Sequence, residues 1–407
     1  MIQVAVLVAL SIAALKPKYQ VVFALVAPVT VLGDSRITPA KIIYLLILIF
    51  LNFISSTDNT DDSIANILIK IKRINFMVMI LLIQLLILGI YNSFSIVETL
   101  RSSVVLLIFL LNFRLISNSF RLWNDNQANM FLIFIGIIGA VSTFYTWVQR
   151  RGVLELQSER LALDADYYAV VAICISIYAS KIRPKKTQRH FEIIMTSFTA
   201  VLLLATLSRT YIVVLTTLVA LAFLKNTGNR IRQSSRNVIA ISIITLLVFV
   251  LVNLLNEEQY RILQIRIIDS IALFSNSQIV SSNSYMESIA SRKVQGSIAR
   301  NLWLESPIFG KGAIPSGLTI DSIFGALVKY GIVGSAVIFI IFLTLYQTLN
   351  RNIARSSLDL GIATFVFIVL VPSSLIGNWT ENKSIWLSLN LVYFLLLVRS
   401  YNSSKVR

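Results

Sequence analysis

The sequence predicts an all-α membrane protein with about twelve or thirteen transmembrane helices and one large polar loop outside the cytoplasm. Of its 407 residues, 56% are hydrophobic and only 14% are charged. Soluble domains average about 45–50% apolar and about 25% charged residues. The mean hydropathy is +0.79. Apolar runs of nearly twenty residues, the length that crosses a bilayer as a helix, recur from end to end.

The expected spans follow one another along the chain, separated by short polar or basic loops. The first two are short, are divided by Lys16-Pro17-Lys18, and are expected to form a tight hairpin. The expected spans are Ile2–Leu15, Tyr19–Leu32, Ile37–Ile54, Ile74–Tyr91, Ser102–Phe113, Met130–Val148, Ala162–Ser180, Phe191–Leu207, Tyr211–Leu224, Val238–Leu255, Ser322–Leu349, Leu360–Ile376 and Ile385–Val398.

The most basic short loops set the expected orientation, because cytoplasmic loops of membrane proteins carry an excess of Lys and Arg. Residues 181–189, 225–236, 351–355 and the tail from Arg399 alternate correctly if all of them are cytoplasmic. The loops at 55–73 and 149–161 are also polar. Because each span crosses the membrane once, counting back from the cytoplasmic loops puts the N-terminus and the loop 149–161 outside. The expected organisation is a transmembrane bundle (1–255), a large external loop (256–321) with short helices, and C-terminal spans with a cytoplasmic tail (322–407).

Arginines are unusually frequent on the expected outer side, in a chain with a formal net charge of +17. The guanidinium group binds phosphate in a two-pronged manner and is always charged, so an outer cluster suits a lipid-linked diphosphate. Ordinary ion pairs with neighbouring glutamates are the alternative. Charge divided among short loops argues against nucleic-acid binding. The outer arginines are Arg150, Arg151, Arg160, Arg209, Arg261, Arg266, Arg292 and Arg300.

Arg209 stands between two apolar runs with one polar residue on either side. An ionisable group at such depth is costly and suggests function, although its long side chain could also reach the outer interface. The chain has one cysteine, Cys174, inside an apolar run, and one histidine, His190, inside a basic loop. No His/Cys cluster could therefore hold zinc or haem, and no metal or cofactor is expected.

Three motifs in the second half resemble the bacterial O-antigen polymerase and O-antigen ligase superfamily. Arg292 is followed, after a predicted helix, by Pro307-Ile308-Phe309-Gly310-Lys311-Gly312, which resembles the family's large-loop signature. The segment from Asp321 to Tyr330-Gly331-Ile332-Val333-Gly334 is similar to the family segment that follows this loop. Leu207-Ser208-Arg209-Thr210 resembles the family's Ser-Arg link between two spans. Before about Leu161 the likeness is one of hydropathy alone.

The resemblance implies a metal-independent glycosyltransferase that uses an undecaprenyl-diphosphate-linked sugar donor at the outer face of the bacterial inner membrane. Arg209, Arg292 and Arg300 would stabilise the leaving diphosphate, because developing negative charge requires compensating cations. Asp321, or as a second choice Glu287, would accept the proton of the attacking hydroxyl. A helix N-cap before Ser322 is the structural alternative for Asp321. Family ligases carry a histidine near Ile320 and Asp321, which this chain lacks, so the polymerase is favoured.

The implied role is polymerisation of O-antigen-type repeat units in lipopolysaccharide or another surface polysaccharide. The implied partners are the lipid-linked oligosaccharide, membrane lipids and a chain-length regulator. An O-antigen ligase, a transporter or flippase for a lipid-linked sugar, and a structural membrane protein remain the alternatives. Gly310 and Gly312 are expected in a turn that other residues would strain, and Pro307 is expected to end the preceding helix. Trp303 could stack on sugar or simply pack.

Overall fold

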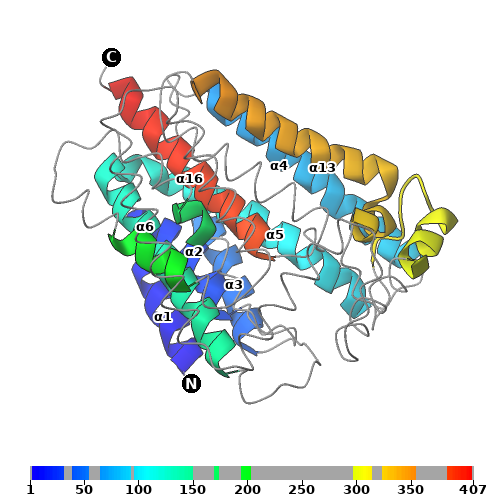
Figure 1. The fold of residues 1–407 in the computed structure, drawn as a ribbon, viewed down its shortest axis with the longest axis horizontal. Coiled ribbons are helices and arrows are strands. Elements are labelled where there is room, and N and C mark those ends of the chain that lie inside the picture. Colours follow the sequence, from blue (N-terminus) through cyan, green and yellow to red (C-terminus); the bar gives the residue numbers. More distant parts are fainter. Residues whose placement is uncertain are drawn as a thin grey trace, which may run out of the picture.

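The computed structural model describes residues 2–31, 39–54, 65–92, 96–149, 169–173, 194–202, 297–313, 323–353 and 383–405 (Figure 1). Every regular element within these ranges is a helix. The described part therefore confirms the all-α class. The expected spans at 211–224, 238–255 and 360–376 lie outside the described residues, and those at 162–180 and 191–207 are described only in fragments.

The first two helices form the expected hairpin. Helix α1 (Ile2–Ala14) and helix α2 (Gln20–Val31) pack against each other across the short 3-10 turn η1 (Pro17–Tyr19). Proline at the start of that turn lacks only an N–H that would have had no helical partner. Helix α3 (Pro39–Ile54) covers the pair, and the ring of Tyr44 stacks on Phe23 with 5.7 Å between centroids.

The next three helices are longer than their apolar cores. Helix α4 (Ala65–Tyr91) begins inside the stretch 55–73 that hydropathy assigns to a loop, and helix α5 (Ile96–Ser119) extends beyond both ends of Ser102–Phe113. Hydropathy finds only the part of a helix that could lie in hydrocarbon, whereas Lys and Arg continue a helix well. Helix α6 (Asp125–Gln149) follows the turn η3 (Phe120–Leu122). Asn124 caps α6 by accepting a 2.8 Å hydrogen bond from the amide of Gln127.

The last two described helices occupy different positions in the bundle. Helix α13 (Ile323–Ile353) runs beside α4, whereas helix α16 (Lys383–Lys405) packs against α2, α5 and α6 (Figure 1). All residues from Trp386 to Val398 are buried, so α16 is enclosed on every side. The helix also continues through the stretch from Arg399 that the sequence suggested as a tail, because α5, α6 and η3 give it surfaces to pack on.

Polar side chains link neighbouring helices in this apolar core. Asn390 is fully buried and donates a 3.5 Å hydrogen bond to the carbonyl of Phe109 on α5. On the same helix α5, buried Asn112 accepts a 3.4 Å hydrogen bond from the hydroxyl of Tyr44. Polar contacts of this kind between apolar helices select one register among many that would bury similar area.

Two described helical segments, Lys72–Tyr91 and Ser103–Leu122, are long and apolar enough to cross a membrane. Four more apolar helices are shorter, at Ala5–Ala14, Pro39–Ile54, Gly325–Ile341 and Trp386–Arg399. The outward face of α4 is itself apolar. Its exposed side chains include Phe76, Met79, Ile80, Ile83, Ile87 and Ile90. An apolar outer face of this extent is typical of surfaces that meet lipid or a partner.

Three chain segments meet at one end of the bundle. The indole of Trp123, between α5 and α6, donates a 3.0 Å hydrogen bond to the carbonyl of Lys18, between α1 and α2. Near the C-terminus, Asn402 donates to the carbonyl of Trp123 at 3.3 Å and to Asp125 at 2.8 Å. The expected alternation of spans assigns all three segments to the cytoplasmic side, and that assignment stays a prediction.

The core contacts of α16 predict a contrast between two Phe→Ala variants. Phe109 is 1% exposed, and its ring lies 5.3 Å from Trp386 and 6.0 Å from Tyr393. We expect Phe109→Ala to lower the free energy of unfolding by about 3–5 kcal/mol, because the cavity cannot close fully. Phe53, on α3, is 88% exposed, and Phe53→Ala should cost about 0.5 kcal/mol or less. Thermal unfolding of both variants in detergent checks this; equal losses would contradict the position of α16.

Candidate functional site

The Pro307–Gly312 signature forms a tight turn after a helix that covers residues 297–305. The amide of Gly310 donates to the carbonyl of Ser306 at 3.0 Å, and the hydroxyl of Ser306 donates to the carbonyl of Gly310 at 2.9 Å. Gly310 and Gly312 have φ angles of +75° and +81°. Residues with a Cβ rarely adopt such angles, so the expectation that these glycines make the turn is confirmed, as is the helix end before Pro307.

The second signature breaks helix α13. Gly331 has φ 63° and ψ −170°, so residues 323–330 form one short helix and the chain starts a new helix after it. A break inside a helix frees backbone N–H groups on one side and carbonyl groups on the other. The sequence did not predict this break, because an isolated glycine in an apolar run is also tolerated in an unbroken helix.

The turn supplies partners for the freed groups of the break. Two amides of the turn donate to carbonyls before the break, and two amides after the break donate to carbonyls of the turn. These hydrogen bonds run from Lys311 to Val328 (2.7 Å), from Gly312 to Lys329 (3.0 Å), from Ile332 to Pro307 (2.9 Å) and from Val333 to Ile308 (3.0 Å). The turn therefore replaces the helical hydrogen bonds that Gly331 interrupts.

This arrangement requires glycine on both sides. A Cβ on Gly331 would overlap the carbonyl oxygen of Ile308 and the amide nitrogen of Gly310, and a Cβ on Gly310 would overlap the amide nitrogen of Gly331. These are main-chain atoms, which cannot rotate away as a side chain could. Both glycines are thus fixed by contact distance as well as by their positive φ angles.

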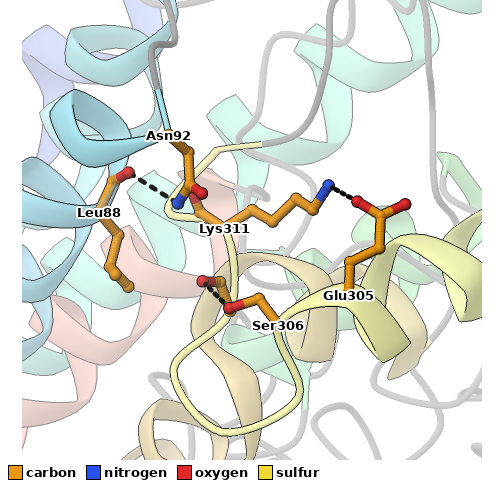
Figure 2. Close-up of polar contacts among 6 residues, drawn as sticks. Leu88, Asn92, Glu305, Ser306 and Lys311 are labelled. Atoms are coloured by element: carbon orange, nitrogen blue, oxygen red, sulfur yellow. Dashed lines mark hydrogen bonds and ion pairs between the residues drawn. The ribbon is translucent and has the colours of Figure 1, made fainter.

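Helix α4 holds the turn and the break together. The side-chain amide of Gln84 donates to the carbonyls of Phe309 and Tyr330, each at 2.9 Å. Two turns further along, Asn92 donates to the carbonyls of Leu88 (2.9 Å) and Lys311 (3.1 Å). Figure 2 shows Asn92 beside the backbone of Lys311 at the end of α4. Between them, a Cβ on Gly312 would lie 2.5 Å from the amide nitrogen of Gly89.

We call this unit the glycine junction: residues 306–312, residues 328–334, and Gln84 to Asn92. The charged side chains in and beside it have different environments. Lys311 pairs with Glu305 and is 17% exposed, whereas the carboxylate side chain is 61% exposed (Figure 2). Arg300 is exposed on the helix that leads to the turn. Lys329 is 1% exposed, with its ammonium 5.4 Å from the centroid of the Tyr330 ring.

The structure describes one of the five predicted site residues, Arg300. The other four, Arg209, Glu287, Arg292 and Asp321, lie outside the described residues. Trp303 packs against Ala299 and Val328, and its indole donates to the carbonyl of Pro307 at 3.2 Å. The packing role of Trp303 is therefore observed.

Sequence reasoning missed Gln84, Asn92 and Lys329. A signal was present for Gln84 and Lys329, because a polar or ionisable residue within an apolar run suggests a specific partner. Among the described residues, no group of three or more His, Cys, Asp or Glu side chains could hold a metal ion. A small hollow bordered by Ile133, Ile173 and Thr199 has no room for a water molecule. The glycine junction is therefore the best-defined polar arrangement in the part that the structure describes.

Comparison with known proteins places no family on this chain: no family model, curated protein or solved structure matches it. The geometry of the glycine junction and the motifs of the sequence are thus the basis on which a function can be proposed.

Close backbone contact at Gly331 predicts the behaviour of three variants. Gly331→Ala should lower the free energy of unfolding by at least about 2 kcal/mol, because the positive φ and the overlap with Ile308 both oppose a Cβ. Gly331→Asn should be no better, because its Cβ meets the same atoms and because φ 63° with ψ −170° lies in a region that essentially only glycine adopts. Ile332→Ala, at an exposed neighbour, is the control and should cost about 0.5 kcal/mol or less. Wild-type stability of Gly331→Asn in thermal unfolding would contradict the requirement for glycine at this position.

Proposed function

We propose that this chain is a polysaccharide polymerase of the bacterial inner membrane. It would transfer glycan repeat units from an undecaprenyl-diphosphate-linked donor to a lipid-linked acceptor on the outer face. One observation carries the proposal: the two signatures that resemble the O-antigen polymerase and ligase superfamily interlock through four backbone hydrogen bonds. They lie about twenty residues apart in the sequence. Because they form one hydrogen-bonded unit in this chain, their joint presence supports the resemblance.

A polytopic membrane location is supported by exposed apolar side chains and by contacts that agree with the expected alternation of spans. Helices α3, α4 and α13 expose large apolar side chains along their outward faces. The alternation of spans assigns the Tyr91 end of α4 and the loop 256–321 to the same outer side. The contacts of Asn92 and Gly89 with Lys311 and Gly312 agree with that assignment. The hydrogen bonds of Trp123 with Lys18 and Asn402 agree in the same way with the assignment of these three residues to the cytoplasmic side.

In the proposed reaction, an acceptor hydroxyl attacks the anomeric carbon of the donor sugar. The bond from that carbon to the diphosphate oxygen breaks, and undecaprenyl diphosphate leaves with the electron pair. Arg209, Arg292 and Arg300 stabilise the growing charge on the diphosphate. Asp321 or Glu287 accepts the hydroxyl proton. The glycine junction connects the segment that carries Arg300 to the transmembrane helices. The bound lipid and the cations therefore keep fixed positions relative to each other.

A deletion strain separates this proposal from its alternatives. Loss of a polymerase leaves a single repeat unit on the anchor. Loss of an O-antigen ligase removes all attached polysaccharide, and loss of a flippase leaves lipid-linked units on the cytoplasmic side. Gel analysis of surface polysaccharide, with lipid-linked intermediates extracted in parallel, distinguishes the three results. Unchanged polysaccharide would contradict all three transfer and transport roles.

Complementation of that strain tests the cations. Arg209→Ala and Arg292→Ala should reduce polymer formation by about 10²–10³-fold, the usual effect of removing one charge-stabilising group. Arg300→Ala should also reduce it, with partial recovery in Arg300→Lys. Lys311→Ala is the matched control, because Glu305 already neutralises that ammonium. Normal chain length with both Arg209→Ala and Arg292→Ala, at wild-type protein level, would contradict the diphosphate site.

A further inference from the structure

The tip of the turn in the glycine junction is apolar and exposed. Ile308 and Phe309 are each 55% exposed, and Leu304, in the last turn of the preceding helix, is 56% exposed. Turns that face water are dominated by Gly, Asn, Asp, Ser and Pro. This turn uses glycine where its backbone requires it and large hydrophobic residues at its outermost positions, which is unfavourable for a tip in water.

The depth of the turn can be read from its contacts with α4. The candidate span in α4 ends at Tyr91, and Asn92 just beyond it binds the carbonyl of Lys311. Gln84 lies about two helical turns, or about 10 Å, before that end. Because Gln84 binds the carbonyl of Phe309, the turn descends along the span from Lys311 to Phe309. Its tip therefore lies well inside the segment of α4 that would occupy hydrocarbon.

The apolar tip also continues the outward face of α13. Ile332 and Val333 are 52% and 42% exposed, and their amides bind the carbonyls of Pro307 and Ile308. Phe339 and Ile340, further along the same helix, are 67% and 47% exposed. The tip and the first turns of α13 after the break thus form one apolar surface.

We infer that residues 306–312 are a re-entrant turn whose Ile308–Phe309 tip contacts lipid acyl chains in the outer half of the bilayer. Non-helical backbone at membrane depth is tolerated only where protein satisfies its polar groups. Gln84 and the four hydrogen bonds to the break in α13 provide partners for three carbonyls of the turn, at residues 307–309, and for the amides of Lys311 and Gly312. Lys311 and Glu305 then lie near the headgroups, at the level of Asn92. The inference rests on the proposed membrane location, but not on glycosyl transfer.

Site-directed spin labelling of the full chain in lipid vesicles tests this inference. The sequence contains one cysteine, so Cys174→Ser gives a background in which single labels can be introduced. Phe309→Cys carries the test label, with Ile308→Cys as a second position. Ile340→Cys on α13 is the lipid-facing reference, and Asn126→Cys, exposed at the start of α6, is the water-facing reference. The ratio of collisions with oxygen to collisions with a water-soluble nickel chelate is measured at each label.

We expect the ratio at Phe309 and Ile308 to approach that at Ile340 and to exceed that at Asn126 several-fold. A ratio at both tip positions like that at Asn126, with Ile340 lipid-like, would overturn the inference while leaving the membrane location intact. Few collisions with either reagent at the tip would indicate that protein covers it, which also overturns the inference. A water-like ratio at Ile340 would instead refute the membrane location itself.

Discussion

Main-chain hydrogen bonding between a turn and a broken helix is the interaction on which the described architecture depends. Gly331 interrupts α13 and leaves polar backbone groups without helical partners. The turn at 307–312 pairs with four of them, and Gln84 of α4 bridges both pieces. Unpaired backbone groups in an apolar environment cost several kcal/mol each in principle. The break and the turn must therefore form together, and residues 306–312 cannot move independently of α4 and α13.

Side-chain charge contributes less to the stability of the glycine junction than backbone geometry does. The ion pair between Lys311 and Glu305 has a largely exposed carboxylate partner, and exposed pairs contribute about 0–1 kcal/mol. The glycines, in contrast, have no tolerated replacement at their contact distances. We therefore regard the glycine junction as a positioning device and Arg300, on the helix beside it, as part of the proposed chemistry. This division explains how residues 297–313, which carry Arg300 and Lys311, keep a fixed position beside α4 and α13.

Much of the described fold was predictable from hydropathy, and the contacts of the site were not. The α1–α2 hairpin, the helix ends near Ile54 and Tyr91 and the strained turn at Gly310 and Gly312 follow from apolar runs and from glycine and proline chemistry. Hydropathy missed the first turns of α4, because these turns contain Lys70, Lys72 and Arg73 and lie before the apolar run. It also could not predict that Gln84 would bind residues more than two hundred positions away, since that pairing depends on tertiary packing. The predicted roles of Arg209, Arg292, Asp321 and Glu287 stay predictions, because these residues lie outside the part of the chain that the structure describes.

Hydrogen exchange at individual amides tests the central claim most directly. The full chain in detergent, digested after exchange and analysed by mass spectrometry with fragmentation, resolves residues 307–313 and 331–334. If the turn completes α13, the amides of Lys311, Gly312, Ile332 and Val333 should exchange as slowly as those inside α4. Exchange of these four amides at the rate of an unstructured chain, with α4 still protected, would show that the turn and the break are not paired.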